Sequence, residues 1–343
     1  MYRIKKNTID VKEISKFLDV EYSGDNFQIN TISSLNDPKD NSILFFSEKI
    51  NSKFNFSDNI QYELKNLVNF KKIILIAKTE IKDKINIPII ESNNPRHDFY
   101  RVIMEYFAEN RFDSGIHETA VIEKDVKIGD NVYIGPHCFI DKHVEIEDNV
   151  KILSNVSIYG ETKIGKNSVI QSNTTIGAEG FSFSFNEDEF VHFAHLGSIR
   201  IGNNVWIGSN TTIEKAQIDQ TIIEDNVNID DHVTIGHNAR IGEFSQITVG
   251  SIVAGRARIG KGCWISPNSV VDNGFQIGNN CVVGSGSLVR TNFPDNCVIF
   301  GSPAKLIRKN YNLLILLKLS YCNFITMSIM HEKTWITAFI CYS

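Results

Sequence analysis

Aliphatic residues recur at every sixth position from the second third of this chain onward. The period runs from Ile122 to Ile176 without a break, and resumes from Ile201 to Val283 with one shift of register. A period of six fits neither the 3.6-residue turn of an α-helix nor the two-residue repeat of an ordinary strand. It is typical of a β-helix, in which three such repeats form one triangular coil and each aliphatic side chain points into a continuous core. The sequence therefore predicts a chain dominated by β-structure, with a left-handed parallel β-helix as its main part.

The bulk composition excludes several kinds of protein. With 35 Lys and Arg against 40 Asp and Glu, the formal net charge is −5, which argues against a nucleic-acid binder. The six cysteines form no CxxC pair, as expected for reduced thiols in the cytoplasm. The first residues, MYRIKKNTIDVKEISKF, contain no apolar stretch of the kind that a secretory signal needs. We therefore expect a cytoplasmic protein that does not bind nucleic acid.

The six-residue period also indicates how the chain is organised. Residues 1–105 lack it and resemble a small α/β domain, residues 106–300 are expected to form the β-helix, and residues 301–343 a C-terminal tail. In the first part, apolar patterns predict helices at 11–18 and 98–110 and strands at 43–46 and 72–77. In the tail, the apolar stretch from Leu313 is interrupted by Lys318 and is marginal for a membrane span. A membrane-associated tail, a packing helix and an out-of-frame extension all remain open.

An insertion interrupts the β-helix at residues 177–198, with the sequence GAEGFSFSFNEDEFVHFAHLGS. It contains five Phe and two His, which a regular solenoid does not need. Loops that leave a rigid scaffold often carry binding residues. We expect the insertion to flank a functional cleft, and a hairpin that only shields an apolar patch is the alternative.

His237 is the residue best placed for chemistry. It follows the core position Ile235 by two residues, so it should lie at a corner of a coil with its side chain outward. Hexapeptide β-helices commonly trimerise through their flat faces, which places such corners in clefts between subunits, and we expect a homotrimer. A neutral imidazole there can remove a proton from an attacking amine or hydroxyl. Asp230 and Asp219 are the candidate carboxylates that would fix its tautomer, and Asp219 precedes His237 by three of the repeats, or one regular coil.

Three blocks of sequence resemble the bacterial UDP-3-O-(3-hydroxyacyl)glucosamine N-acyltransferases of lipid A synthesis. The first block is Gly24-Asp25 with Ile32-Ser33-Ser34-Leu35-Asn36-Asp37 and Ile43-Leu44-Phe45-Phe46-Ser47. The second block is Asn94-Pro95-Arg96 with Gly115-Ile116-His117-Glu118-Thr119-Ala120. The third block is Ile176-Gly177-Ala178-Glu179-Gly180-Phe181-Ser182-Phe183 with Thr211-Thr212-Ile213-Glu214 and Ile235-Gly236-His237-Asn238. The resemblance implies transfer of an acyl group from a thioester, either acyl-CoA or an acyl-carrier protein, to the amino group of a nucleotide-linked amino sugar. The product would serve lipid A or a surface polysaccharide. No bound cofactor and no metal site are expected.

The same resemblance implies roles for individual residues. His237 matches the family's catalytic base, and Asp230 matches an acidic residue that helps orient it. Phe45 matches the aromatic residue beside the nucleotide base, and the segment around Gly180 and Phe181 matches the insertion that flanks the cleft. Phe46 and Asn238 complete the predicted acceptor-binding set.

Departures from the family pattern concern both substrates. Phe275 stands where the family has a second His, and the segment Glu48-Lys49-Ile50-Asn51 lacks the family's second aromatic residue. The segment Gly301-Ser302-Pro303-Ala304-Lys305 is similar instead to the ending of CoA-dependent sugar acyltransferases. Turn amides together with a nearby basic residue are expected to hold the pantetheine and phosphates of the donor. The candidates are Arg256, Lys261 and Lys305.

Two other functions fit parts of the sequence. His232 and His237 have the His-x4-His spacing of zinc ligands in γ-carbonic anhydrases, with His195 upstream, so a zinc-dependent hydratase is one alternative. The shift of register between Ile213 and Ile223 argues against His195 as the third ligand. A non-catalytic scaffold is the other alternative, and it leaves the aromatic insertion and the N-terminal domain unexplained.

Overall fold

The computed structural model describes residues 2–46, 64, 66–310, 326–331 and 334–339. The chain divides into two compact units, Met1–Asp113 and Ser114–Ser343. This boundary lies slightly later than the expected one at residue 105. The segment at 48–51, which lacks the second aromatic residue, lies outside the described residues.

The first unit is a small α/β domain built on a parallel sheet in the order β4-β5-β6-β7. These strands are β4 (Thr31–Ile32), β5 (Ser42–Phe45), β6 (Ile74–Ala77) and β7 (Ile89–Glu91). The other elements are β1 (Tyr2–Ile4), β2 (Ile9–Asp10), α1 (Val11–Phe17), β3 (Gln28–Ile29), η1 (Leu67–Asn69), η2 (Thr79–Lys84), α3 (Pro95–Val102), the π-helical turn η3 (Ile103–Phe107) and β8 (Ala108–Asn110). Both expected helices are present, but the last three residues expected in the second one, 108–110, form β8 instead. The second one begins at Pro95, because proline is suited to the first turn of a helix.

Alternate residues of the sheet enter two separate cores. Ile74 and Ile76 of β6 pack with residues of α1 and α3 on one face, whereas Leu75 and Ala77 pack with Leu67 of η1 on the other. This alternation is the two-residue repeat of a strand, and both faces of the sheet are covered. Side chains near the end of β5 therefore have to enter one core or the other.

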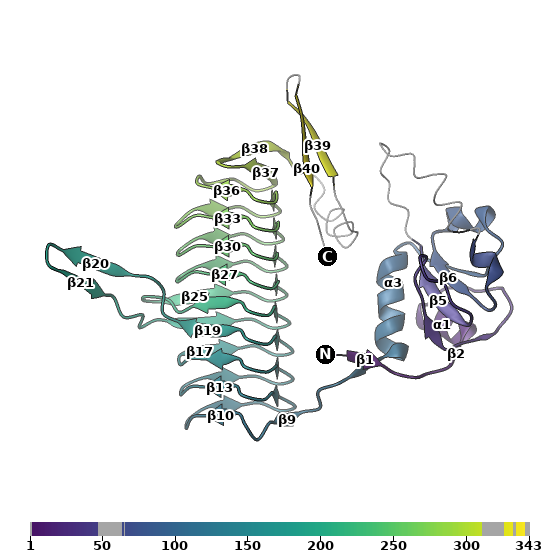
Figure 1. Ribbon diagram of the computed structural model, residues 1–343, viewed down its shortest axis with the longest axis horizontal. Coiled ribbons are helices and arrows are strands. Elements are labelled where there is room, and N and C mark those ends of the chain that lie inside the picture. Colours follow the sequence, from purple (N-terminus) through teal and green to yellow (C-terminus); the bar gives the residue numbers. More distant parts are fainter. Residues whose placement is uncertain (1, 47–63, 65, 311–325, 332–333, 340–343) are drawn as a thin grey trace. The chain divides into compact units, whose positions relative to one another are not determined.

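The second unit is a triangular parallel β-helix, which confirms the fold predicted from the six-residue period (Figure 1). Its three faces are sheets of nine, eight and eleven strands, which we call the first, second and third face. The first face comprises β10 (Val121–Ile122), β13 (Phe139–Ile140), β16 (Ser157–Ile158), β19 (Thr175–Ala178), β24 (Thr212–Glu214), β27 (Thr234–Ile235), β30 (Ile252–Val253), β33 (Val270–Val271) and β36 (Leu288–Val289). The second face comprises β11 (Lys127–Ile128), β14 (Glu145–Ile146), β17 (Thr162–Ile164), β22 (Ser198–Ile201), β25 (Gln220–Ile223), β28 (Arg240–Ile241), β31 (Arg258–Ile259) and β34 (Gln276–Ile277).

The third face ends in an antiparallel strand. It comprises β9 (Gly115–Ile116), β12 (Tyr133–Ile134), β15 (Lys151–Ile152), β18 (Val169–Ile170), β23 (Trp206–Ile207), β26 (Asn228–Ile229), β29 (Gln246–Ile247), β32 (Trp264–Ile265), β35 (Val282–Val283), β37 (Cys297–Gly301) and β38 (Ala304–Lys309). All pairs are parallel except the last, in which β38 folds back on β37. Residues 301–309 of the expected tail therefore belong to the end of the β-helix.

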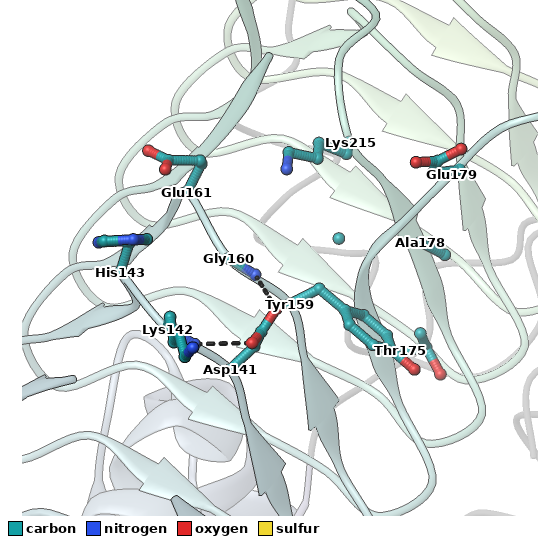
Figure 2. A pocket seen from close by; sticks show the side chains of 11 residues that line it. Asp141, Lys142, His143, Tyr159, Gly160, Glu161, Thr175, Ala178, Glu179 and Lys215 are labelled. Atoms are coloured by element: carbon teal, nitrogen blue, oxygen red, sulfur yellow. Dashed lines mark hydrogen bonds between the residues drawn. The ribbon is translucent and has the colours of Figure 1, made fainter. Parts of the chain in front are cut away.

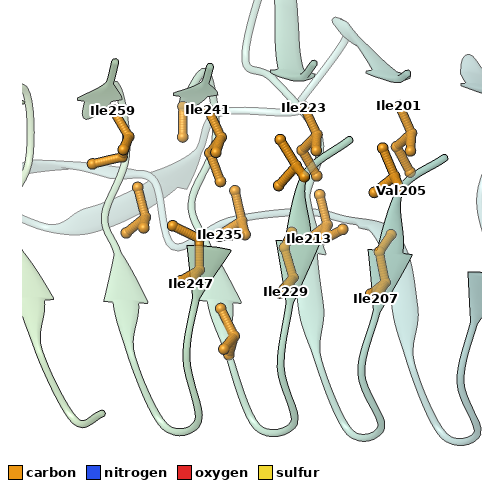
Figure 3. Packing of buried hydrophobic residues seen from close by; sticks show 14 of the residues in the cluster. Ile201, Val205, Ile207, Ile213, Ile223, Ile229, Ile235, Ile241, Ile247 and Ile259 are labelled. Carbon is orange, nitrogen blue, oxygen red and sulfur yellow. The ribbon is translucent and has the colours of Figure 1, made fainter. Parts of the chain in front are cut away.

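The aliphatic residue of each repeat lies in a single core inside the triangle. Ile229, Ile235 and Ile241, from three successive faces, are fully buried and belong to one cluster. Figure 3 shows these isoleucines with their counterparts from neighbouring coils, such as Ile207 and Ile247, which pair in register with Ile229. Many corner residues have positive φ, and Asn is frequent among them, as at Asn204 and Asn226, because its short polar side chain tolerates this conformation. Gly165 is required for a different reason, since a Cβ there would lie 2.6 Å from the carbonyl carbon of Gly202 in the next coil.

The insertion leaves the β-helix after β19 and returns at β22. It forms an antiparallel hairpin of β20 (Phe183–Asn186) and β21 (Glu189–His192), which projects from the solenoid in Figure 1. Its phenylalanines are exposed, and Phe181, just before the hairpin, is 91% exposed. In the C-terminal tail, β39 (Thr326–His331) and β40 (Thr334–Phe339) form another antiparallel hairpin. In the parts of the chain that the structure describes, no helix is both long enough and apolar enough to cross a membrane.

Candidate active site

His237 lies at the corner between the first and second faces, which we call the active corner. Strand β27 ends at Ile235, Gly236 begins the turn, and Asn238 adopts a positive φ of 60°. Ile235 is fixed in the core, and His237 lies past the end of the strand, in the turn, where it is only partly buried. The corner placement predicted from the six-residue period is therefore what the structure shows.

Asn238 determines the tautomer of the His237 ring. Its side-chain oxygen accepts a hydrogen bond from the backbone amide of Gln217 at 3.1 Å, and its side-chain nitrogen donates to the carbonyl of Ile218 at 2.5 Å. The same oxygen lies 3.1 Å from Nδ1 of His237. Since this oxygen can only accept, Nδ1 carries the proton and Nε2 keeps its lone pair. The unprotonated nitrogen is therefore Nε2, the atom that a general base would use.

The ring of His237 packs directly over the next coil. Gly255 follows His237 by one regular coil of three repeats, and a Cβ on Gly255 would lie only 2.5 Å from Nε2 of His237. The backbone amide of Gly255 donates no hydrogen bond within the described residues. On the other side, the Glu214 carboxylate accepts the backbone amide of His237 at 3.0 Å. A glycine whose amide donates no hydrogen bond within the described residues thus lies against the imidazole, and a carboxylate holds the backbone of His237.

The base of the insertion folds back onto this corner. A Cβ on Gly180 would lie 2.5 Å from Oε2 of Glu214 and 3.3 Å from Nε2 of His195. The rings of His195 and His237 have centroids 5.5 Å apart, and His195 is buried. Burial, followed by the neighbouring His237, lowers the pKa of His195. Two imidazoles therefore meet at the active corner, one of them held in its neutral form.

A pocket of about 720 Å³ lies along the same corner, and Figure 2 shows the residues that line it. Its lining residues are Asp141, Lys142, His143, Tyr159, Gly160, Glu161, Thr175, Gly177, Ala178, Glu179 and Lys215. The Asp141 carboxylate accepts the amides of Lys142 and Gly160 at 2.8 and 3.2 Å, so it holds the turns of two coils together. Glu179 and Lys215 join the pocket to the residues around His237, because they adjoin Gly180 and Glu214 in sequence.

The structure places the two predicted carboxylates at different corners. Asp230 follows β26 and lies at the corner between the third and first faces, where its carboxylate accepts the amides of Asp231 and Val249 at 2.9 and 3.1 Å. Within one chain, Asp230 is therefore not the group that orients His237, which is a correction. Asp219 lies at the active corner, in the turn between β24 and β25 of the coil before His237. That turn is longer than a regular one: before it Thr212 pairs with Thr234, which aligns Lys215 with His237, whereas after it Ile222 pairs with Arg240, which aligns Asp219 with His237.

The three predicted donor-binding residues lie at different places. Arg256 is at the active corner, where its amide donates to the carbonyl of His237 at 2.7 Å and its guanidinium to Gln217 Oε1 at 2.6 Å. Lys261 is at the corner between the second and third faces, paired with Glu243 at 2.9 Å. Lys305 lies on β38. Of the three, Arg256 is the residue that shares a corner with His237.

The two phenylalanines of the first unit point to opposite cores. Phe46 is buried in the cluster that contains Leu44 and Leu75, so its ring is not available to a nucleotide, which corrects that prediction. Phe45 is half-buried on the other side, with its ring centroid 4.9 Å from that of Phe99 and 6.4 Å from that of Tyr100. Part of the Phe45 ring remains accessible.

The ligand set expected for a zinc hydratase does not assemble in one chain. His232 lies in the turn after β26, at the corner where Asp230 lies, and so not at the active corner. His195 does reach His237, although the shift of register argued against it. The sequence did not predict Glu214, Gly255, Lys215 or His195 at the active corner. Counting one coil forward from His237 identifies Gly255, whereas His195 is brought into place only by the folding of the insertion.

Comparisons with known proteins agree with this architecture. Residues 143–178 and 256–291 match the model "Bacterial transferase hexapeptide (six repeats)", and residues 125–160 match "Hexapeptide repeat of succinyl-transferase". The UDP-3-O-acylglucosamine N-acyltransferase of Saccharophagus degradans is 47% identical over 87 residues, which are 25% of this chain and 24% of that protein. That of Rickettsia akari is 44% identical over 91 residues, 26% of each. The chain thus spans about a quarter of the length of the curated relatives it matches.

Solved structures extend the likeness across the β-helix. The UDP-N-acetylglucosamine acyltransferase of Francisella novicida superposes with a TM-score of 0.54 at 27% identity, covering 59% of this chain and 73% of that one. LpxA from Acinetobacter baumannii gives a TM-score of 0.54 at 25% identity, covering 59% and 77%. The repeats, the coil architecture and these relatives together make the chain similar to the hexapeptide-repeat acyltransferases, among them UDP-3-O-acylglucosamine N-acyltransferase.

Proposed function

We propose that the protein transfers an acyl group from a thioester to the amino group of a nucleotide-linked amino sugar, in the cytoplasm, for lipid A or surface polysaccharide synthesis. The observation that carries the proposal is the geometry of His237. Its Nδ1 is committed to Asn238, and its Nε2 is the free nitrogen at an outward corner of the β-helix. The names of the relatives support the acyl transfer and the sugar nucleotide.

The reaction follows from the groups at the active corner. The sugar amine attacks the thioester carbonyl, and Nε2 of His237 takes the proton that the amine loses. The carbonyl oxygen becomes an oxyanion, for which the free amide of Gly255 is the donor that we assign. When the C–S bond breaks, the imidazolium returns the proton to the departing thiolate, and His237 is neutral again.

The donor is an acyl-CoA or an acyl-carrier protein, and either presents phosphopantetheine. Arg256 is the donor-binding residue that lies at the active corner, and we propose that its guanidinium pairs with a phosphate group of the donor. Lys215, at the rim of the pocket, is a further cation at the same corner. Lys261 and Lys305 stay as proposed contacts for the outer part of a long donor.

We further propose that the acceptor's nucleotide base binds at Phe45. Stacking of a base on an aromatic ring contributes about 1–3 kcal/mol in nucleic-acid complexes. Phe45→Ala is therefore expected to raise KM for the sugar nucleotide about tenfold or more. Steady-state kinetics with each substrate varied in turn should show a smaller change in KM for the acyl donor. An equal rise in KM for both substrates would mean that the nucleotide base binds elsewhere, with the 177–198 insertion as the next candidate.

The active form is proposed to be a homotrimer, because a cleft formed from a single corner has only one wall. In a trimer with cyclic symmetry, a neighbouring chain would supply the second wall, and the assembly would contain three equivalent clefts. Light scattering on the full chain at micromolar concentration should give three times the 38.8 kDa mass of one chain. A monomer under these conditions would contradict the proposal.

A substrate screen tests the reaction itself. Purified protein is incubated with amino-sugar nucleotides paired with acyl-CoAs and with acyl-carrier proteins, and the products are read by mass spectrometry. We expect one acceptor to gain the mass of an acyl group at its amine, with release of one free thiol per acyl transfer. Hydration of carbon dioxide with no acylated product would support the zinc hydratase instead.

A further inference from the structure

Three potential metal ligands converge at the base of the insertion. Glu179 comes directly after β19, His192 is the last residue of β21, and His195 lies between β21 and β22. Each offers one ligand atom, and these atoms lie within 4.8 Å of one another. Nδ1 of His192 is already 3.4 Å from Oε2 of Glu179, and the rings of His192 and His195 have centroids 6.0 Å apart. Residues from both ends of the insertion therefore meet at one point.

His195 is a polar group without a partner inside the protein. Only 2% of the residue is exposed, and within the described residues neither Nδ1 nor Nε2 has a hydrogen-bond partner. Leaving a buried polar atom unsatisfied costs about 1–3 kcal/mol. A ligand that bonds to one of these nitrogens would remove that penalty. An imidazole held neutral by burial is also the form that coordinates a metal ion.

We propose that Glu179, His192 and His195 bind a divalent transition-metal ion of the zinc class. Two imidazoles and one carboxylate form a donor set typical of zinc, and a hard cation such as magnesium would prefer oxygen ligands alone. Zinc requires its ligand atoms at about 2.0–2.2 Å, so the three groups must contract slightly around the ion. Glu179 and His192 are partly exposed, which leaves a path for entry of the ion from solvent. The site departs from the expectation, made from the sequence, that the chain has no metal ligands.

The position of the site gives the ion a specific task. The ion links Glu179, at the start of the insertion, to His192 and His195, near its end. It therefore closes residues 179–195 into a loop. Closing a loop through a metal ion lowers the entropy of its open forms and stabilises the ordered one. The ion would thereby hold the hairpin β20–β21 at a fixed angle and keep His195 beside His237. This role is separate from acyl transfer, because none of the three ligands serves as the proposed base.

Metal binding to the full chain tests the proposal. Protein stripped with a chelator is titrated with zinc by calorimetry, and with cobalt by visible absorption, which reports tetrahedral coordination directly. We expect one ion per chain. His192→Gln and Glu179→Gln, both at partly exposed positions, should each weaken zinc binding by at least about tenfold. Removing a residue that only hydrogen-bonds to a metal ligand already costs about 10–100-fold in metal affinity, so losing a ligand itself should cost no less. His232→Gln, an exposed corner histidine away from the site, is the matched control and should keep the affinity.

Hydrogen exchange provides the second readout. Zinc should slow exchange of the amides in 179–195 of the unsubstituted chain, and should have no such effect in His192→Gln. Absence of a zinc-dependent change in both readouts would overturn the proposal, and His195 would then be satisfied by an ordered water. Loss of zinc through His232→Gln but not His192→Gln would overturn it as well, in favour of the hydratase ligand set. Neither result depends on turnover, so failure here leaves the acyltransferase proposal intact.

Discussion

Replacing His237 with alanine is expected to lower kcat for acyl transfer by about 10²–10⁴-fold, the usual scale for the loss of a general base. The reason lies in the bonds around the ring. Asn238 holds Nδ1, so Nε2 is fixed at the active corner with its lone pair available. Without it, the attacking amine must give its proton to water. Initial rates at saturating concentrations of both substrates measure the effect.

Gly255→Ala provides an independent test of the same geometry. The new methyl group would meet Nε2 of His237, a side-chain atom, so the ring must swing away. We expect turnover to fall as it does in His237→Ala, with the melting temperature almost unchanged in both variants, because a corner side chain contributes little to the core. His232→Ala, at another corner, should keep wild-type turnover. Near-normal kcat in His237→Ala would refute the proposed mechanism.

The second large effect concerns stability. Ile229→Ala is expected to lower the free energy of unfolding by about 2–5 kcal/mol, the range for a buried isoleucine cut to alanine. Ile229 is fully buried and is paired in register with Ile207 before it and Ile247 after it. The narrow triangular core has backbone on every side, so it cannot collapse to fill the space. Chemical denaturation measures the change.

Asn228→Ala is the matched control, because Asn228 is the other residue of strand β26 and is exposed. Substitutions at exposed positions usually change stability by no more than about 0.5 kcal/mol. Comparing the two variants separates the contribution of core packing from any effect that a substitution has on strand β26 itself. Similar losses of unfolding free energy in both variants would mean that it is wrong to place Ile229 in the core and Asn228 on the surface.

The sequence predicts the β-helix well because its main stabilising contacts are periodic along the chain. Each coil places the same position in the core, so the spacing of Ile229, Ile235 and Ile247 contains the information about which side chains point inward. The corner position of His237 follows from the same count. The position of Gly255 beside it follows too, since one coil separates them.

Where the period fails, prediction from the sequence fails as well. The coil containing Asp219 is longer than the regular one, so the count of three repeats back from His237 holds only for the strands after the turn and fails for the strands before it, where Lys215 is the aligned residue. Asp230 is a candidate both from its closeness to His237 in sequence and by resemblance, but it lies in the turn before β27, whereas His237 lies in the turn after it. His195 reaches His237 because the insertion folds back, and the spacing of residues along the chain does not reveal such a return. In the first unit, the sequence predicts that the adjacent residues Phe45 and Phe46 both bind the acceptor. Neighbouring residues of a strand point to opposite faces, so the two side chains enter different cores.

Strand β38 has a consequence for how such molecules can associate. A stack of parallel coils has no natural end, because the last coil offers unpaired amides and carbonyls to any strand of similar shape. On the third face, β38 runs antiparallel to β37, and it carries the positive charges of Lys305, Arg308 and Lys309 along that edge. A second β-helix arriving end to end would meet a strand of the wrong direction and a row of positive charges that it would have to desolvate. Growth into fibres along the axis is thereby discouraged, while the flat sides of the prism stay open to lateral assembly.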